Sequence, residues 1–288
     1  IDRNYPLLKL GLRGLGFILL FIAMLGPYWG TKEESTTMSS REIYLLLDVS
    51  ASMNAQDVMP SRLDKAKQTL TELIRQMKGE KIGLILFTEQ AYVQCPLTRD
   101  HQAVQLFLEL AQPQQFTQTG TQFRSALAVA MDRFINVDKT SQKIGRGIVL
   151  VSDGEDFGDK YVSLVERLKG ANITVFPLGV GTYEGAPIPH FANDSRDGFK
   201  RYEDGTMAIS RLVEDDLRSM ADEFGTDYLH LDDPFLDVGM LREQIYERTA
   251  SPVETSSEEI SNNTYQLFVF LSVVCLLLSM FMMPIRQI

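Results

Sequence analysis

The chain reads Ile43-Tyr44-Leu45-Leu46-Leu47-Asp48-Val49-Ser50-Ala51-Ser52, a D-x-S-x-S motif placed directly after an apolar run. An uncharged run of this length is typical of a strand buried on both faces of a parallel sheet. In open α/β sheets, ligands bind outside the carboxyl ends of such strands. The motif is therefore expected at the edge of the sheet where ligands bind.

Two further oxygen-bearing side chains extend the pattern. Thr121 follows Gly120, and Asp153 follows a second apolar run, Ile148 to Val151. Because both acids follow strands of the buried type, Asp48 and Asp153 can meet at one edge despite their distance in the sequence. Any one of these residues alone is better explained as a turn or a helix cap. Their order along the chain predicts a shared site.

The donor types favour a small, hard cation. Mg²⁺ takes about six oxygens and keeps several of its waters, so proteins supply it with few carboxylates. The predicted cofactor is Mg²⁺, with Mn²⁺ or Ca²⁺ as alternatives, and the predicted ligands are Asp48, Ser50, Ser52, Thr121 and Asp153. Since most of these ligands are neutral, the ion keeps positive charge and an open position can take a carboxylate from another protein.

These five positions resemble the metal-ion-dependent adhesion site (MIDAS) of the von Willebrand factor A (VWA) superfamily. Further stretches resemble the membrane-anchored aerotolerance (Bat) proteins, in particular the B-type members that accompany MoxR-type AAA+ ATPases. The similarity extends over residues 7–285 and is carried by residues 52–58 (SMNAQDV), residues 60–67 (PSRLDKAK), and GVGT followed by GAPIP within residues 179–189.

The resemblance implies Mg²⁺ in the site and partners among other Bat-type membrane proteins. It also implies coupling, direct or indirect, to a cytoplasmic MoxR-type ATPase, and a role in envelope stress tolerance. The partner would present an acidic residue to the cation. These are expectations of the family, and the residues of this chain do not identify the client.

The charge is unevenly distributed along the 288 residues. The net charge is −10, but residues 32–264 carry −13, because residues 1–31 contribute +2 and residues 265–288 contribute +1. Nonspecific nucleic-acid binding needs clustered Lys and Arg, so an acidic middle region argues against it. Cys95 and Cys275 are the two cysteines, and no disulfide between them is expected.

Apolar stretches flank the acidic region on both sides. Residues 1–31 are predicted to form a transmembrane helix with a basic cytoplasmic flank, and residues 265–288 a second one. A cleavable signal peptide is the alternative for the first stretch. Positive charge lies outside the pair of helices, so the positive-inside rule predicts a bacterial inner-membrane protein whose middle domain faces the periplasm or exterior.

Strand and helix patterns alternate between these helices, which predicts an α/β fold with a doubly wound, mostly parallel sheet flanked by helices. The VWA domain is expected over residues 32–250, with a polar hairpin insertion at 182–210 that serves either as decoration or in partner specificity, and a polar linker at 251–264. Strands are predicted at 42–47, 81–87, 91–94, 147–151, 173–178 and 227–231, and helices at 62–78, 100–111, 122–135, 212–224 and 236–246.

An enzyme is the alternative to a binding module. A metal-dependent phosphatase or hydrolase can use an Asp after a strand as a nucleophile, but such a site needs a second carboxylate where Ser50 stands. Neither a phosphate-binding G-x-x-x-x-G-K-[ST] loop nor an H-E-x-x-H motif is present, and the three histidines are isolated. Glu155 and Asp156 are expected to be solvated loop carboxylates, with orientation of the ligands as their alternative role. A third possibility, a structural protein without metal, is disfavoured because all five ligand types are retained.

Overall fold

The computed structural model describes residues 5–26, 28–37, 41–113, 120–137, 144–158, 161–192, 195–233, 236–249, 255–263 and 265–281. Contacts within the chain divide it into two units. One unit comprises Met38–Glu254, and the other combines Ile1–Thr37 with Thr255–Ile288.

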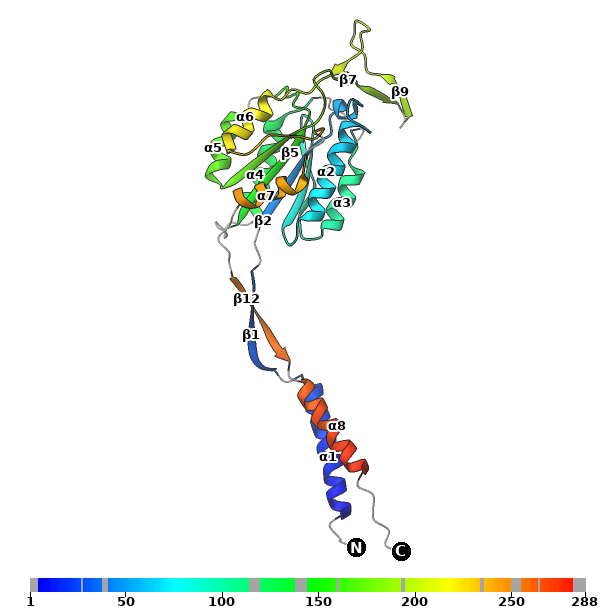
Figure 1. Cartoon of the computed structure of the whole chain (residues 1–288), viewed down its shortest axis with the longest axis vertical. Coiled ribbons are helices and arrows are strands. Elements are labelled where there is room, and N and C mark those ends of the chain that lie inside the picture. Colours follow the sequence, from blue (N-terminus) through cyan, green and yellow to red (C-terminus); the bar gives the residue numbers. More distant parts are fainter. Residues whose placement is uncertain are drawn as a thin grey trace. The chain divides into compact units, whose positions relative to one another are not determined.

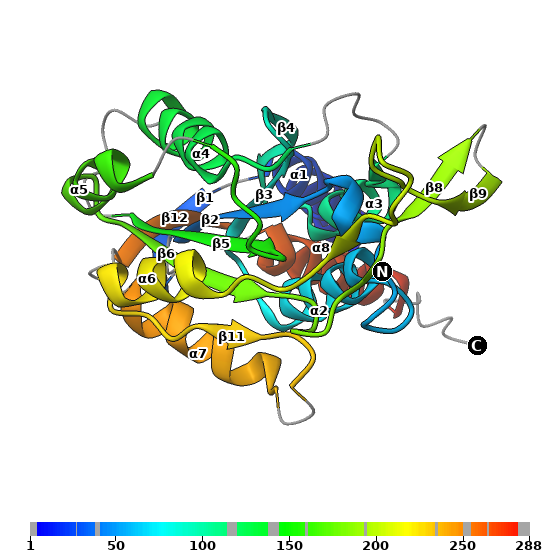
Figure 2. The ribbon, with the colours of Figure 1, turned by 90° about the horizontal axis from the view of Figure 1, so that it is seen from above.

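The larger unit is built on a six-stranded sheet with the strand order β11-β6-β5-β2-β3-β4 (Figures 1 and 2). All neighbouring strands are parallel except β3 and β4, which form an antiparallel pair at one edge. Within this sheet, the chain passes first through β2 in the middle, then through β3 and β4 on one side, and it returns to β5 on the other side. The strands are β2 (Arg41–Asp48), β3 (Lys81–Phe87), β4 (Ala91–Thr98), β5 (Gly145–Ser152), β6 (Ile173–Gly179) and β11 (Leu229–His230).

Helices cover both faces of this sheet, so the predicted doubly wound α/β architecture is confirmed. Alternate residues of β2 enter two separate cores: Leu45 and Leu47 face α2, α3 and α7, whereas Tyr44 and Leu46 face α4, α5 and α6. The helices are α2 (Arg62–Gln76), α3 (His101–Leu110), α4 (Phe123–Val137), α5 (Val162–Gly170), α6 (Asp215–Phe224) and α7 (Val238–Arg248), and a short 3₁₀ helix, η1, spans Ala51–Asn54.

Local signals explain where these helices begin and end. Ser61 caps α2, since its side chain accepts from the backbone N–H of Asp64, and Asp100 caps α3 in the same way. Gly225 ends α6 in the left-handed conformation that favours glycine. Helix α5 was not predicted. Its nine residues are too few to show a clear helical periodicity in the sequence.

Residues 182–210, here called the arm, contain a hairpin that projects from the larger unit beyond the end of the sheet (Figure 2). Strands β8 (Pro189–Ala192) and β9 (Ser195–Phe199) pair antiparallel in this hairpin. At the base of the arm, β7 (Ala186–Pro187) pairs with β10 (Ile209–Ser210), so the two ends of the arm lie side by side.

The smaller unit contains the two predicted membrane segments. Helix α1 (Tyr5–Met24) includes an 18-residue stretch, Leu7–Met24, that is long and apolar enough to cross a membrane, with a mean hydropathy of 2.0. Helix α8 (Tyr265–Phe281) is apolar but shorter, and the rest of the predicted second span, residues 282–288, lies outside the described residues. The two helices pack together, and the Ser272 hydroxyl donates to the Gly16 carbonyl at 2.8 Å.

The structure corrects part of the predicted polar linker at 251–264, of which residues 251–254 and 264 lie outside the described residues. Residues 255–263 form strand β12 (Thr255–Asn263), which pairs antiparallel with β1 (Tyr28–Thr37). Residues 32–37, which the sequence had assigned to the middle domain, therefore belong to the smaller unit. Polar composition alone does not reveal such a ribbon, because each strand finds its partner more than two hundred residues away.

Candidate metal centre

The candidate site lies at the carboxyl ends of the two central strands. β2 and β5 are parallel neighbours, and Leu47 pairs with Val151 in their register. Asp48 ends β2, while Asp153 directly follows β5. Because the chain order reverses between these strands, they form the topological switch point at which doubly wound sheets bind ligands. The sheet therefore brings the two acids to one edge.

Asp48 accepts three hydrogen bonds in a fully buried position. Its Oδ1 accepts from the backbone N–H of Ser50 at 2.8 Å. Its Oδ2 accepts from the Ser152 hydroxyl at 2.6 Å and from the Thr121 hydroxyl at 3.4 Å. The carboxylate is thus held from the loop after β2, from β5 and from the loop before α4.

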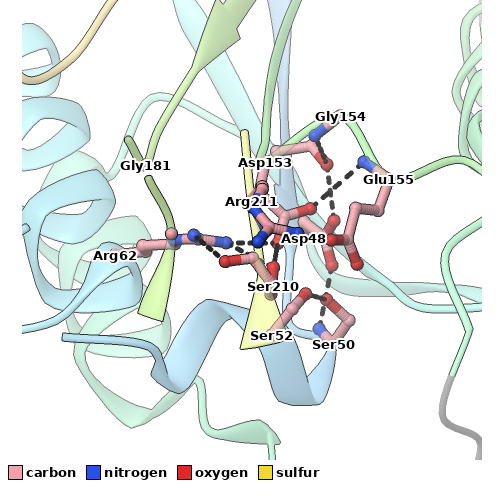
Figure 3. Close-up of polar contacts among 12 residues, drawn as sticks. Asp48, Ser50, Ser52, Arg62, Asp153, Gly154, Glu155, Gly181, Ser210 and Arg211 are labelled. Carbon is pink, nitrogen blue, oxygen red and sulfur yellow. Dashed lines mark hydrogen bonds and ion pairs between the residues drawn. The ribbon is translucent and has the colours of Figure 1, made fainter. Parts of the chain in front are cut away.

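The two motif serines complete this side of the site. The hydroxyls of Ser50 and Ser52 lie 2.9 Å apart in hydrogen-bond contact, and both residues are buried, as is Thr121. Figure 3 shows Asp48, Ser50, Ser52 and Asp153 converging in one cluster. The structure thus places all five predicted ligands together, and their binding of a metal stays a prediction.

Asp153 is held in place by a turn that requires glycine. Gly154 has φ +81°, and a Cβ there would lie 1.8 Å from the Val213 carbonyl oxygen. Val213 in turn donates its backbone N–H to the carbonyl of Asp153 at 2.9 Å. Any side chain at residue 154 would push these two segments apart, which explains the Asp-Gly pair after β5.

A buried arginine binds the side chain of Asp153. Arg62 is fully buried, and its Nη1 lies 3.0 Å from Asp153 Oδ2. The same guanidinium binds Asp57 through Nε and Nη2 at 2.8 and 2.7 Å, a bidentate pair. It also donates to Ser210, to the hydroxyl at 2.7 Å and to the carbonyl at 3.0 Å. Removing one partner of a buried pair of this kind typically costs about 3–5 kcal/mol.

Burial and neighbouring charge shift the pKa values of these groups. Burial and the charge of Asp153 raise the pKa of Asp48 to about 7, although hydrogen bonds from Ser152 and Ser50 oppose the rise. Burial would raise the pKa of Asp57, but the hydrogen bonds from Arg62 and Thr182 outweigh it and leave that pKa lowered. Without a nearby cation, Asp48 therefore takes up a proton at a higher pH than an ordinary aspartate does.

Glu155 and Asp156 are more engaged than the solvated loop carboxylates predicted from the sequence. Glu155 Oε1 accepts from the backbone N–H of Arg211 at 3.1 Å. Asp156 Oδ1 accepts from the backbone N–H of Phe123 at 3.4 Å, at the start of α4. Burial, followed by the charge of Asp153, raises the pKa of Glu155, and burial raises that of Asp156. Both side chains tie the loop after β5 to its surroundings.

The donor set fits a hard divalent cation. Two carboxylates and three hydroxyls supply only oxygen, the element that Mg²⁺, Mn²⁺ and Ca²⁺ prefer. Within the part of the chain that the structure describes, no three side chains of the His, Cys, Asp and Glu types gather as a soft or carboxylate-rich site would require. The raised pKa of Asp48 points the same way, since a cation between two buried acids offsets their repulsion.

Four residues of this region were not identified from the sequence. Ser152 carried one weak signal, as a polar residue beside Asp153. Asp57 and Arg62 lay in stretches that resemble the Bat proteins, with Arg62 also predicted as the first residue of a helix, but neither was assigned a role. Ser210 was predicted only as part of a polar insertion. Their roles depend on contacts over as many as 148 residues of chain, which no local pattern encodes.

Comparison with known proteins supports the fold. Residues 43–155 match the von Willebrand factor type A domain. BatB from Bacteroides thetaiotaomicron is 31% identical, with a TM-score of 0.63, over 73% of this chain and 100% of that one. An aerotolerance-related membrane protein from Bacteroides fragilis, solved with multiple mutations to serines, is 32% identical, with a TM-score of 0.65, over 72% and 99%.

A UPF0353 protein of Mycolicibacterium paratuberculosis is 30% identical over 202 residues, which cover 65% of this chain and 58% of that protein. The chain spans about half the length of the curated relatives it matches. Proximal thread matrix protein 1 from the mussel byssus, solved with zinc in its MIDAS motif, is 16% identical with a TM-score of 0.50 over 73% of this chain and 48% of that one. At that identity the likeness establishes the fold alone.

Proposed function

Since this chain belongs to the von Willebrand factor type A family, among the aerotolerance-related membrane proteins that include BatB, we propose that it is a membrane-anchored protein-interaction module. It binds an acidic residue of a partner through a divalent cation held by five oxygen donors. The cation is Mg²⁺, with Mn²⁺ or Ca²⁺ as alternatives. The five donors are Asp48, Ser50, Ser52, Thr121 and Asp153.

One observation supports this proposal most strongly. Asp48 is fully buried beside Asp153, yet three of the five donors are neutral hydroxyls. A bound divalent ion therefore meets at most two negative charges, and Arg62 already compensates part of the charge of Asp153. The ion keeps positive charge and attracts a carboxylate from outside the chain.

The proposed role is binding without catalysis. Ser50 stands where a phosphoryl-transfer site would place a second carboxylate. His101 and His230 contact the backbone carbonyls of Glu80 at 2.9 Å and Gly181 at 2.7 Å, and within the described residues neither forms a hydrogen bond with Asp48. The proposed partners are other Bat-type membrane proteins and, directly or indirectly, a MoxR-type ATPase. The proposed setting is the bacterial inner membrane, with the larger unit facing the periplasm or exterior.

Titration of the full chain in detergent with MgCl₂ tests the cation site by calorimetry. The wild type is expected to bind Mg²⁺, and Asp48→Asn to lose measurable binding, because the substitution removes one of two charged ligands. Asp222→Asn, the same chemical change at an exposed position of α6, is the matched control and should bind as the wild type does.

Partner capture and turnover distinguish the remaining alternatives. Capture from solubilised membranes is expected with Mg²⁺ and is expected to disappear with EDTA or in Asp48→Asn. Capture by the wild type that survives EDTA contradicts the cation bridge. Hydrolysis of para-nitrophenyl phosphate by the wild type, lost in Asp48→Asn, would instead establish an enzyme.

A further inference from the structure

The guanidinium of Arg62 joins parts of the chain that are distant in sequence. It contacts Asp57 before α2, Asp153 after β5 and Ser210 in β10, by five bonds of 2.7 to 3.0 Å. The Arg62 side chain has no exposed surface, and those of Asp57 and Asp153 are 4% and 0% exposed. Water cannot replace these bonds, so a movement of one partner acts directly on the others.

Both ends of the arm are attached to this cluster. At the beginning of the arm, Thr182 donates its backbone N–H and its hydroxyl to Asp57 Oδ2, at 2.8 and 3.1 Å. At its end, Ser210 accepts from Arg62 and pairs with Ala186. Gly181, with φ +129°, packs on the guanidinium, since a Cβ there would lie 2.8 Å from Arg62 Nε (Figure 3).

The two oxygens of Asp153 have different partners. Oδ2 accepts from Arg62 at 3.0 Å and from the Ser210 hydroxyl at 3.4 Å. Among the residues that the structure describes, Oδ1 accepts from the backbone N–H of Glu155 alone, at 3.3 Å. The arm side of the carboxylate is thus occupied by the planar fork of Arg62. Arg62 thus links Asp153 to Ser210 at the base of the arm.

We propose that Arg62 is a positioning residue that couples the cation site to the arm. This inference rests on the proposed function, because it requires a cation held by Asp153. Filling the site restrains Asp153, which restrains Arg62 and the base of the arm, and coupling of this kind is reciprocal. The arm, whose base this coupling restrains, exposes the apolar side chains of Phe199, Tyr202 and Met207.

Amide hydrogen exchange of the full chain in detergent, with and without MgCl₂, tests this coupling. In the wild type, Mg²⁺ is expected to slow exchange at residues 182–185 and 209–212 by about fivefold or more. In Arg62→Lys the charge remains but the planar fork is lost, so one ammonium cannot serve all the acceptors. Mg²⁺ is expected to bind this variant within about tenfold of the wild-type affinity, while the slowing at the base of the arm disappears.

Arg201→Lys is the matched control. Arg201 is exposed, and its Nη1 donates to the Gly205 carbonyl within the arm at 2.8 Å, away from the cation site. This variant should keep both the affinity for Mg²⁺ and the slowing. Ser210→Ala is the milder test, since it removes the hydroxyl's bonds to Arg62 and to Asp153 but keeps the bond from Arg62 to the Ser210 carbonyl. It is expected to reduce the slowing, and it tests the contacts of this cluster if Arg62→Lys does not fold.

The outcomes separate this inference from the proposed function. A wild-type chain that binds no Mg²⁺ overturns both. A wild-type chain that binds Mg²⁺ with unchanged or faster exchange at the base of the arm overturns the coupling alone. Slowing that persists in Arg62→Lys, or that is undiminished in Ser210→Ala where Arg62→Lys is unfolded, overturns the role of Arg62.

Discussion

Asp48 shows how a single carboxylate can be costly for stability and useful for function. It is fully buried, its pKa is raised to about 7, and the charge of Asp153 is among the causes. Three hydrogen bonds only partly compensate for the loss of water. A divalent ion placed between the two acids offsets the remaining cost, so the features that lower the stability of the ion-free protein also favour binding of the ion.

The raised pKa of Asp48 predicts a dependence of stability on pH. The folded state holds the Asp48 proton more tightly than the unfolded state, in which the pKa is 3.8. The free energy of unfolding without cation should therefore fall as pH rises from 3.8 toward 7, by at most about 1.4 kcal/mol per pH unit from this group. Added Mg²⁺ should stabilise more at pH 8 than at pH 5, because the ion competes with the proton.

Thermal unfolding of the wild type and of Asp48→Asn at pH 5 and pH 8, with EDTA or MgCl₂, measures this effect. With EDTA, the decrease in Tm from pH 5 to pH 8 should be smaller in the variant. Glu155 and Asp156 are present in both proteins, so the difference reports on Asp48. Equal decreases in both proteins would show that Asp48 does not titrate in this range.

Helix α2 carries a residue of the site in its first turn, so the signal that starts this helix also positions Arg62. The Ser61 hydroxyl accepts from the backbone N–H of Asp64 at 3.1 Å and donates to the Asp64 carboxylate at 2.7 Å. Both bonds fix the turn in which Arg62 is the first helical residue. The N-cap is therefore local in sequence, whereas its effect reaches Asp153 through Arg62.

Ser61→Ala is expected to lower the free energy of unfolding by about 1 kcal/mol, because one N–H of the first turn loses its acceptor. Urea unfolding in EDTA measures the change. Ser219→Ala is the matched control, since the Ser219 hydroxyl only donates to the Asp215 carbonyl inside α6. That change should stay within about 0.5 kcal/mol. Equal effects of the two substitutions would argue against a capping role for Ser61.

Viewed as a whole, the molecule separates its chemistry between two units. The larger unit holds the candidate cation site and the arm, and the smaller one holds the helix long and apolar enough to cross a membrane. Strand β1 lies in the segment just before the larger unit, and β12 in the segment just after it. The two strands pair with each other. The candidate cation site and the candidate membrane helix thus lie in separate parts of the chain.

The proposed orientation predicts which residues are reached from outside the cell membrane. A cysteine at Glu203, an exposed turn of the arm, should react with a membrane-impermeant maleimide in intact spheroplasts. A cysteine at Asn4, in the basic flank, should react only after permeabilisation. The wild type controls for background, since Cys95 is buried and Cys275 lies in an apolar helix. The reverse labelling pattern would place the larger unit in the cytoplasm.

Much of the fold could be predicted from sequence because its signals are local. Strand β3 was predicted with its observed bounds, and β2 and α4 within two residues at each end, since apolar runs and helical periodicity act over a few residues. The base of the arm and the ribbon of β1 and β12 were not predicted. Their partners are set by contacts across the chain, and their composition is that of ordinary loops.

The same division applies to the candidate site. The five oxygen donors could be named from the order of residues, because strand ends and a glycine turn place them predictably at the edge of a parallel sheet. The roles of Arg62 and Ser210 emerged only from folding, because a buried guanidinium takes whichever acceptors the packed elements bring within 3 Å. The role of Ser152 did so because its acceptor, Asp48, lies 104 residues away in the sequence. Residue types and their order thus indicated the chemistry, while long-range packing set which charges balance it.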